Sequence, residues 1–397
     1  MIYNEYDIIV VGAGPSGSAA AGTIAQAGLR VLCIEEHATI GYPVQCAGIL
    51  SNNAFRECRV TDASLLHSVS GATIVAGASS FSFDAKTTKA VIVDRGVLDR
   101  EMAMNAATEG ASYLPKSYVA SINPVKKVIT TRGPEGVREI GYHVLIAADG
   151  PKSSIARWLQ MKRAPMYLSG VQCEILWPGD DEKVEVHPNA SPDFFAWVIP
   201  TGNNRARVGL CGLSDVKNRF TRFYSMIAKK AGTTSMHHFV TGTVPIGIMP
   251  KTYGQGVLFV GDAGGFAKPT SGGGVYTGVR SARHAAATAI EAYEQDSTSD
   301  QVLCEYEKRW NADFGTELRF GMRCMSIRRQ VDPQDVEQII HVMNDPDIAD
   351  IIVKHGDMDR PQKVVSRLML QPKMYRCLFP FMKAGGKSFI PSYQKEP

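Results

Sequence analysis

The sequence predicts an α/β fold in which a parallel-sheet domain is interrupted by a mainly antiparallel sheet and followed by a helical C-terminal region. Residues 8–34 contain an apolar run, a glycine turn, a helical pattern and a second apolar run, which is the order of a parallel βαβ unit. Residues 69–93 and 166–245 instead form short runs separated by turn residues, as antiparallel strands do. From residue 301 onward the pattern is almost entirely helical.

The length and composition are those of a soluble globular protein with more than one lobe. The 397 residues exceed what one compact core usually holds, so two or three lobes are expected. Apolar residues make up 44% of the chain and charged residues 21%, as in an ordinary soluble protein. The changes of pattern predict a discontinuous parallel-sheet domain at residues 1–65, 94–160 and 250–296, an antiparallel-sheet domain at 66–93 and 161–249, and a helical domain at 297–397.

The sequence favours a cytoplasmic location and no metal centre. No stretch approaches the roughly 20 consecutive apolar residues of a membrane-spanning helix. The first apolar run follows the acidic residues Glu5 and Asp7 rather than the basic residues of a signal peptide. The eight cysteines form no C-x-x-C pair and no zinc-type spacing with histidine, so free thiols are expected. A bridge between two helices is the alternative for Cys304 and Cys324.

The C-terminal tail concentrates positive charge. Residues 360–397 carry eight Lys or Arg and one Glu, whereas the first 359 residues carry 35 basic and 38 acidic groups. The aromatic residues of this tail are Tyr375, Phe379, Phe381, Phe389 and Tyr393. One interpretation is a helix that packs its aromatics on the main body, with solvated lysines outside. The other is peripheral contact with an anionic inner membrane surface. Nucleic acid is disfavoured as a partner.

The first motif is a glycine loop between the first strand and the first helix. Gly12 permits the tight turn, Gly14 allows the backbone to approach a pyrophosphate, and Gly17 lets the helix pack on the strand. The N–H groups of the helix N-terminus then favour phosphate. Glu35 ends the second strand, 23 residues after Gly12, where an acid accepts hydrogen bonds from a ribose 2′-hydroxyl. The sequence therefore predicts a Rossmann-type dinucleotide-binding domain.

Two further Asp-Gly segments follow buried strands. Asp149-Gly150 is open to two interpretations, a site residue or a turn in which Asp149 caps a helix. Asp262 lies in a segment with seven glycines between residues 261 and 278, among them Gly272-Gly273-Gly274. So many glycines are more than a simple turn requires. They allow a helix N-terminus to face a ring or a phosphate closely, while Asp262 bonds a ribitol or ribose hydroxyl.

In order and spacing, these three motifs resemble the FAD fingerprints of the p-hydroxybenzoate-hydroxylase-like flavoprotein superfamily, over about residues 5–295. The resemblance implies FAD, with its pyrophosphate at the glycine loop, its adenosine ribose at Glu35 and its ribitol near Asp262. Arg100 matches the family's helix arginine that reaches the cofactor; the alternative is a surface arginine. The residues implied to contact FAD are Gly12, Gly14, Pro15, Ser16, Gly17, Glu35, Glu36, Cys46, Ala47, Gly48, Arg100, Ala120, Asp149, Gly150, Asp262, Gly273, Gly274 and Val275.

Two segments resemble the geranylgeranyl reductase branch of that superfamily. Residues 43–48, PVQCAG, match its P-x-x-C-x-G segment beside the flavin. Residues 195–200, FAWVIP, followed by Gly209, are similar to its Y-x-W-x-F-P…G-x-G substrate motif. Here Phe195 replaces the tyrosine and Cys211 the second glycine, which puts the shape of the substrate pocket in doubt. The implied substrate-binding residues are Phe195, Trp197, Pro200 and Gly209, although core packing explains Phe195 and Trp197 almost equally well.

The resemblance implies reduction of prenyl C=C bonds on archaeal-type membrane phospholipids or on a chlorophyll-type precursor, with the lipid version fitting a basic, aromatic tail better. Hydride would come from reduced flavin and a proton from Cys46, whose alternative role is a small buried apolar residue. The chain has no second dinucleotide loop, so the expected electron donor is NAD(P)H bound transiently or a ferredoxin-like protein. Two rival functions stay open: a flavin-dependent monooxygenase or halogenase, and a non-catalytic prenyl-binding escort protein.

Overall fold

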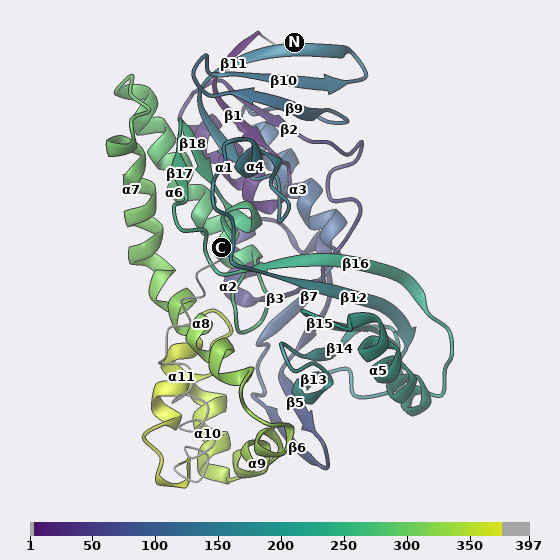
Figure 1. Cartoon of the computed structure of the whole chain (residues 1–397). Coiled ribbons are helices and arrows are strands. Elements are labelled where there is room, and N and C mark those ends of the chain that lie inside the picture. The colour runs from purple at the N-terminus through teal and green to yellow at the C-terminus, as the bar shows by residue number, and fades with distance from the viewer. Residues whose placement is uncertain (1–3, 375–397) are drawn as a thin grey trace, which may run out of the picture. The chain divides into compact units, whose positions relative to one another are not determined.

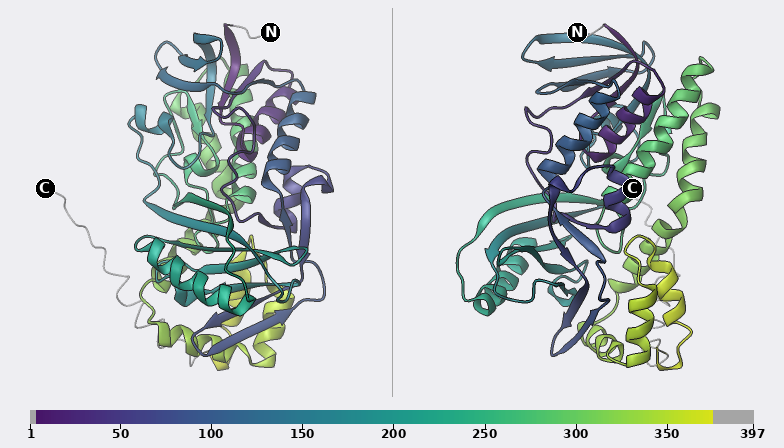
Figure 2. Two further views of the ribbon diagram at one scale, coloured as in Figure 1. Left: turned by 90° about the vertical axis from the view of Figure 1, so that its right-hand side faces the viewer. Right: turned by 180° about the vertical axis from the view of Figure 1, so that it is seen from behind.

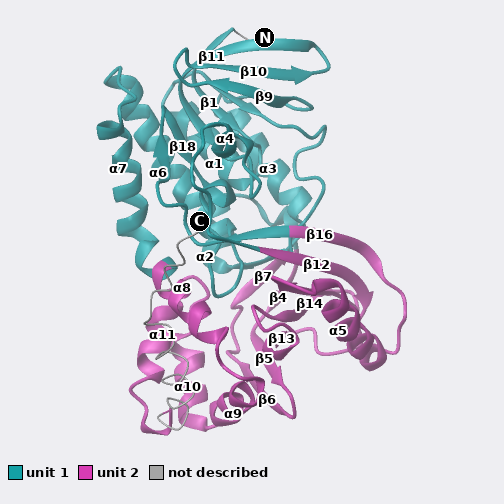
Figure 3. Ribbon diagram, in the orientation of Figure 1, with its two compact units in different colours: residues 1–65, 93–167, 243–318 teal, residues 66–92, 168–242, 319–397 magenta. Residues whose placement is uncertain are grey.

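The computed structural model describes residues 4–374 and divides the chain into two compact units (Figures 1 and 3). Unit 1 consists of residues 1–65, 93–167 and 243–318, and unit 2 of residues 66–92, 168–242 and 319–397. Each unit is therefore assembled from three separate stretches of chain. Helix α8 (Thr316–Arg328) spans the last of the boundaries between them.

Unit 1 contains a twisted sheet with the strand order β17-β18-β11-β1-β2-β8, in which β10 pairs with β11 and β9 with β10. The neighbours from β18 to β8 are parallel, whereas β17, β10 and β9 are antiparallel additions. The strands are β1 (Glu5–Val11), β2 (Val31–Ile34), β8 (Ser112–Leu114), β9 (Tyr118–Asn123), β10 (Val128–Gly133), β11 (Gly136–Ala147), β17 (Tyr253–Gly254) and β18 (Val257–Phe259), and the short β3 (Ile49–Ser51) lies outside this sheet.

Both faces of this sheet are buried, as expected for parallel strands. Ile8 and Val10 of β1 contribute to one core cluster, which also holds residues of α1, α6 and α7. Ile9 and Val11 point the other way, into a second cluster, because successive side chains of a strand alternate between faces. The helices of unit 1 are α1 (Pro15–Gln26), α2 (Asn52–Cys58), α3 (Arg95–Thr108), α4 (Ser154–Trp158), α6 (Val275–Glu294) and α7 (Asp300–Trp310), with short turns at Asp62–Ser64 and Gly261–Gly264 and a π-helical turn at Asn311–Gly315.

Unit 2 is built on a sheet with the strand order β16-β12-β15-β14-β13-β5-β6. Strand β15 pairs antiparallel with β12 and with β14, and β14 pairs antiparallel with β13. Strand β13 pairs with β5 in parallel. The strands are β5 (Gly71–Ala76), β6 (Ser79–Asp84), β12 (Met166–Leu176), β13 (Lys183–His187), β14 (Ala196–Gly202), β15 (Arg205–Gly212) and β16 (His237–Ile246); β4 (Leu65–Val69) and β7 (Ala90–Val93) lie outside it.

Helices pack on this second sheet in two places. Helix α5 (Val216–Ala231) buries Phe220, Phe223 and Ile227 in a core with residues of β12, β14 and β15. Helix α9 (Pro333–Met343) packs Val336 and Ile340 against Phe81 of β6. The remaining elements of unit 2 are α10 (Pro346–His355), α11 (Pro361–Leu368) and the short turns at Pro188–Ala190 and Pro372–Met374. Within residues 4–374 no helix combines the length and the apolar character needed to cross a bilayer.

The predicted fold class is confirmed: a Rossmann-type parallel sheet is interrupted by a mainly antiparallel sheet, and the C-terminal region is helical. The sequence also predicts a separate helical domain over residues 297–397, whereas the structure divides these helices at residue 318. The physical reason is burial, because α7 places Leu303 and Tyr306 in the core of unit 1 and α9 completes the core on β5 and β6. The aromatic residues of the basic tail lie outside the described residues.

Candidate functional site

The predicted cofactor motifs leave the same edge of the sheet in unit 1. Val11, the last residue of β1, pairs with Ile34 of β2 and with Ala147 of β11. Ala147 in turn pairs with Phe259, the last residue of β18. The carboxyl ends of four parallel strands are therefore aligned, and the loops that follow them emerge side by side. Ligands of open α/β sheets bind at this edge, where the strand order reverses.

The glycine loop combines tight packing with an open position. Gly12 has a φ of +102°, and a Cβ there would overlap the backbone oxygen of Ala148. A Cβ on Gly17 would overlap the backbone oxygen of Gly12. Around Gly14, by contrast, nothing lies within 4 Å of where a Cβ would be. Gly14 caps α1 and Pro15 occupies its first turn, so the open space lies at a helix N-terminus, where a phosphate is favoured.

The first and third motifs are in contact through Ser16. The turn at Gly261 has a φ of +56°, and a Cβ there would overlap the Ser16 hydroxyl. A Cβ on Gly278 of α6 would lie 2.6 Å from the same hydroxyl. Close approach of α1 and α6 therefore depends on two glycines that are distant from Ser16 in the sequence. A Cβ on Gly274, the N-cap of α6, would lie 2.9 Å from Oδ1 of Asp262, so this acid borders a second helix N-terminus.

Glu35 is held in place by the glycine loop. Its Oε2 accepts a hydrogen bond from the backbone N–H of Ala13 at 2.9 Å. Its Oε1 accepts one from the backbone N–H of His37 at 2.9 Å and lies 2.7 Å from Nδ1 of that ring. The Glu35 side chain is 12% exposed, whereas Glu36 is exposed. The arrangement orients one carboxylate, that of Glu35, at the end of β2.

Asp149 has one carboxylate oxygen bonded to a helix and one without a protein partner. Its Oδ2 accepts a hydrogen bond from the backbone N–H of Ile155 in α4 at 3.2 Å, although the N-cap residue of that helix is Ser153. The other carboxylate oxygen, Oδ1, is buried and has no protein partner in the described part of the chain. Burial raises the pKa of Asp149. Gly150 follows with a φ of +75° and open space around it, so this acceptor lies beside room for a ligand.

Asp262 is the more strongly perturbed acid of the site. Burial raises its pKa to about 6, and the charge of Arg95 partly opposes that shift. An Asp with a strongly raised pKa is more typical of a functional site than of an ordinary surface position. Gly273 and Val275 flank the helix cap at Gly274, opposite this carboxyl.

Arg95 is a site residue that the sequence reasoning missed. It opens α3, its side chain is 14% exposed, and its guanidinium binds Asp99 in a bidentate pair with distances of 2.9 and 3.0 Å. The side chain of Cys46 is a further hydrogen-bond partner of Arg95. Arg95 therefore joins the Cys46 segment to the Asp262 region. The sequence signal that could have found Arg95 is its position: it is the first residue of α3, the helix that also carries Arg100.

The other predicted contacts lie around this centre. Cys46 is half-buried and its sulfur accepts the backbone N–H of Gly48 at 3.3 Å, so residues 46–48, which include Ala47, form a compact turn. The Arg100 guanidinium lies over the Tyr42 ring, 5.4 Å from the centroid. Ala120 lies in β9, at the irregularity between β9 and β10.

The predicted substrate residues lie together in unit 2, on β14, β15 and the residue before β14. A Cβ on Gly209 would overlap the indole of Trp197, so the ring lies flat on the glycine of the neighbouring strand. The Phe195 ring meets Trp197 edge-on, with 6.1 Å between centroids. Sequence reasoning missed Gln172 of β12, whose Oε1 accepts the Trp197 indole N–H at 3.1 Å. Pro200 is buried further along β14.

Trp197 and Gly209 lie on the sheet face that α5 does not cover, whereas Pro200, opposite Ala206, follows Val198 on the α5 side. Val198 and Val208 alternate with Trp197 and Gly209 and face the α5 core. Trp197 is therefore outside that core, which favours the substrate interpretation over packing in it. Cys211 is buried at 4% exposure, and the seven cysteines in the described range are free thiols, Cys304 and Cys324 among them.

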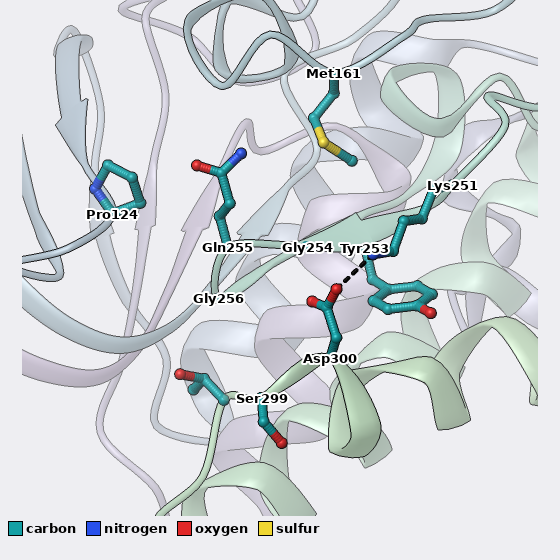
Figure 4. A pocket seen from close by; sticks show the side chains of 10 residues that line it. Pro124, Met161, Lys251, Tyr253, Gly254, Gln255, Gly256, Ser299 and Asp300 are labelled. Atoms are coloured by element: carbon teal, nitrogen blue, oxygen red, sulfur yellow. Dashed lines mark hydrogen bonds and ion pairs between the residues drawn. The ribbon is translucent and has the colours of Figure 1, made fainter.

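A cavity of about 490 Å³ lies elsewhere in unit 1 (Figure 4). It is lined by Pro124, Met161, Lys251, Tyr253, Gly254, Gln255, Gly256, Thr298, Ser299 and Asp300. Gly256 directly precedes β18, so this cavity borders the edge of the sheet opposite the cofactor motifs. A Lys251–Asp300 ion pair crosses it. It includes none of the predicted site residues.

Comparison with known proteins agrees with this geometry. The family model of an FAD binding domain matches residues 5–312. Digeranylgeranylglycerophospholipid reductase 2 of Methanothermobacter thermautotrophicus is 30% identical over 87% of this chain and 94% of that protein. An uncharacterized protein of Methanocaldococcus jannaschii is 33% identical over 90% of this chain and 93% of that protein.

Solved structures share the fold. A geranylgeranyl bacteriochlorophyll reductase-like protein from Thermoplasma acidophilum has a TM-score of 0.85 and 23% identity, covering 95% of this chain and 99% of that chain. The flavin-dependent brominase Bmp2 has a TM-score of 0.70 and 15% identity, covering 97% and 99% of the two chains. At these identities the likeness concerns the fold alone.

The aligned strand ends and the matched domain define a flavoprotein, a flavin-dependent oxidoreductase built on an FAD-binding domain. The residues present fit FAD: Gly14 leaves room at a helix N-terminus, Asp149 has a buried oxygen without a protein partner, and Glu35 is oriented by the glycine loop. Within the FAD-binding proteins, the chain belongs to the digeranylgeranylglycerophospholipid reductase family.

Proposed function

We propose that this protein reduces C=C bonds in the geranylgeranyl chains of archaeal-type glycerophospholipids. The observation that carries the proposal is the similarity, at 30% identity over most of both chains, to a protein named digeranylgeranylglycerophospholipid reductase. It is supported by Trp197, which lies against Gly209 on the sheet face that α5 does not cover and contacts the Phe195 ring, because aromatic side chains suit contact with an apolar prenyl chain.

FAD, when bound and reduced, supplies the hydride for one carbon of the alkene. The chain's residues bind and orient: the N-terminus of α1 holds the pyrophosphate, Glu35 the adenosine ribose and Asp262 a ribitol hydroxyl. Cys46 delivers the proton to the second carbon. The hydride and the proton together saturate the double bond, and the thiolate left on Cys46 takes up a proton from solvent.

Arg95 positions Cys46. Its guanidinium is a hydrogen-bond partner of the Cys46 side chain, so it helps to hold the sulfur in the turn at residues 46–48. Asp99, paired with Arg95 on its other side, fixes the direction of that guanidinium.

The test is a single turnover without oxygen. The protein-bound flavin is reduced chemically and a geranylgeranyl glycerophospholipid is added. We expect reoxidation of the flavin together with lipid mass gains in steps of two hydrogens. No reoxidation by the lipid would contradict the proposal, and rapid oxygen consumption with a hydroxylated or halogenated product would favour a monooxygenase or halogenase. A protein that binds the lipid but takes up no flavin would be an escort protein.

Replacing Cys46 tests the proton donor. Cys46→Ala should leave FAD bound and slow lipid-dependent reoxidation by about 10²–10⁴-fold, the usual contribution of a general acid. Cys304→Ala removes a half-buried thiol from α7 in the same unit and is the matched control. An unchanged rate in Cys46→Ala would remove Cys46 from the mechanism.

The electron donor is a separate part of the proposal. We propose that reducing equivalents arrive from NAD(P)H bound transiently or from a ferredoxin-like protein. Following flavin reduction with NADH, NADPH and a reduced ferredoxin in turn distinguishes these donors, and reduction by none of them would exclude both classes. A peripheral position at the inner membrane surface belongs to the same proposal, since the substrate is a membrane lipid.

A further inference from the structure

Helix α5 in unit 2 has a strongly basic outer surface. Its inner side buries Val216, Phe220, Phe223 and Ile227 in the sheet core. Between Val216 and Ala231 the helix contains no Asp or Glu. Its cationic residues are Lys217, Arg219, Arg222, Lys229 and Lys230. Figure 2 shows α5 in front of its sheet in the left-hand view, so this outer side is turned to the viewer.

Most of this charge is not neutralised within the chain. Arg222 lies 3.5 Å from a carboxylate oxygen of Asp215, and Lys230 lies 2.6 Å from one of Glu185. The other three cations, Lys217, Arg219 and Lys229, form no ion pair with any residue between positions 4 and 374. They are available to an external anion.

Large apolar side chains border the same helix. Phe239 at the start of β16 is 57% exposed, and its ring meets Phe220 of α5 edge-on at 6.2 Å. The connecting segment is tied to the helix by a hydrogen bond from the Tyr224 hydroxyl to the backbone oxygen of Thr234 at 3.0 Å. The other exposed apolar residues of the region are Leu213, Met226 and Met236, at 37%, 52% and 39% exposure. We call residues 213–239 the α5 surface.

The charge of the α5 surface differs from that of the chain around it. It carries five Lys or Arg and one Asp, while the other residues between positions 1 and 359 include 30 basic and 37 acidic groups. The tail at residues 360–397 is the other basic segment. Lysine is depleted at protein–protein interfaces. Lysines together with exposed Phe, Met and Leu side chains instead match a bilayer surface, where cations meet anionic headgroups and apolar side chains enter the interface.

We propose that the α5 surface docks this protein on an anionic phospholipid bilayer. The inference rests on the proposed function, because it explains how an enzyme without a membrane-spanning helix among its described residues would reach a lipid substrate. Lys217, Arg219 and Lys229 meet the headgroups, and Phe239 and Met236 enter the interfacial layer.

Vesicle co-sedimentation of the full chain tests the docking. Binding should be strong to vesicles of phosphatidylcholine with phosphatidylglycerol, weak to phosphatidylcholine alone, and reduced by salt. The double variant Lys217→Gln/Lys229→Gln should bind the anionic vesicles about 25-fold more weakly, since each cation near such a surface strengthens binding about fivefold, or about 1 kcal/mol. Phe239→Ser should weaken binding without changing its salt dependence. The basic C-terminal tail is present in every variant, so the ratios isolate the α5 surface.

Lys126→Gln/Lys127→Gln is the matched control. It removes the same charge from an exposed and a half-buried lysine in the turn between β9 and β10, and it should change vesicle binding by less than threefold. An equal loss in this control, or binding that does not depend on phosphatidylglycerol, would overturn the proposal. So would wild-type affinity in the Lys217→Gln/Lys229→Gln variant.

Activity separates this proposal from the proposed function. With lipid dispersed in detergent, Lys217→Gln/Lys229→Gln should oxidise its reduced flavin at the wild-type rate, because neither lysine lies in the cofactor unit. With the same lipid in anionic vesicles the rate should fall in parallel with binding. If no geranylgeranyl lipid reoxidises the flavin in either form while vesicle binding behaves as expected, the proposed function fails and the docking stands. A rate on vesicles that does not follow binding would overturn the role of docking in substrate access.

Discussion

Replacing Asp262 with Asn should make the FAD-free protein more stable and its binding of FAD weaker. Burial raises the pKa of Asp262 from 3.8 to about 6 in the folded protein. A group whose folded pKa is raised contributes stability that is complete below the unfolded pKa and is lost as the pH rises through the folded value. At neutral pH the native protein therefore carries a buried charge that the unfolded chain solvates, and Asp262→Asn removes that charge.

The magnitude follows from the size of the shift. Two pKa units correspond to about 3 kcal/mol. Integrated over pH, Asp262→Asn should raise the free energy of unfolding by about 1.5 kcal/mol at pH 5 and about 3 kcal/mol above pH 7. FAD affinity should move the opposite way, by about 10- to 100-fold, because a hydrogen bond to a charged acceptor contributes about 1.5–3 kcal/mol.

Urea denaturation of the FAD-free protein at pH 5, 6, 7 and 8 measures the first effect, and flavin titration the second. Asp62→Asn, an equal charge change at an exposed position of the same unit, is the control and should leave the pH profile unchanged. If the stability difference between Asp262→Asn and the wild type stayed constant from pH 5 to pH 8, the reasoning about burial would be refuted. An unchanged FAD affinity would refute the assignment of Asp262 to the ribitol.

Three further predictions separate packing from ligand binding. Gly14→Ala should change the free energy of unfolding of the FAD-free protein by less than about 1 kcal/mol, since space is open there, yet weaken FAD binding at least tenfold in a flavin titration. Gly17→Ala, where a Cβ overlaps backbone, should lower the free energy of unfolding by about 1–3 kcal/mol in urea denaturation. Equal stability of the two variants would contradict this reasoning. Gly209→Ala should displace the Trp197 ring, which should change the tryptophan fluorescence and lower the free energy of unfolding by about 1–3 kcal/mol. An unchanged fluorescence spectrum would argue against the contact. Tyr306→Phe should cost about 1–2 kcal/mol in the same denaturation assay, because the buried hydroxyl donates to the last backbone oxygen of β18 at 2.6 Å, and a neutral effect would mean that water replaces it.

The elements that bear the cofactor motifs were predictable because their signals are local. The apolar run, glycine loop and helix at the N-terminus correspond to β1 and α1. The helix implied at Arg100 is α3, and the helix N-terminus expected at the triple glycine is that of α6. Helix boundaries follow from capping residues and apolar periodicity, which short windows of sequence contain.

Long-range packing was the part that sequence patterns did not reveal. Arg95 and Gln172 carry no local signature, because their importance comes from partners on other elements: Cys46 for the first and Trp197 for the second. The division of the C-terminal helices at residue 318 likewise depends on which core each helix completes. Apolar periodicity identifies a buried face but not the surface that covers it.

The sequence by itself determined the chemistry of the cofactor loops: glycines where backbone must turn or approach, and acids at the ends of strands, each specified within a few residues. Only the tertiary structure decided that Val11, Ile34, Ala147 and Phe259 end in register. That alignment is what brings loops more than 100 residues apart in the chain to one edge. Asp262 follows β18 at this edge, where it is half-buried and desolvation raises its pKa. The physical reason is that hydrogen-bond register and desolvation belong to pairs of distant segments, whereas conformational freedom and charge belong to single residues.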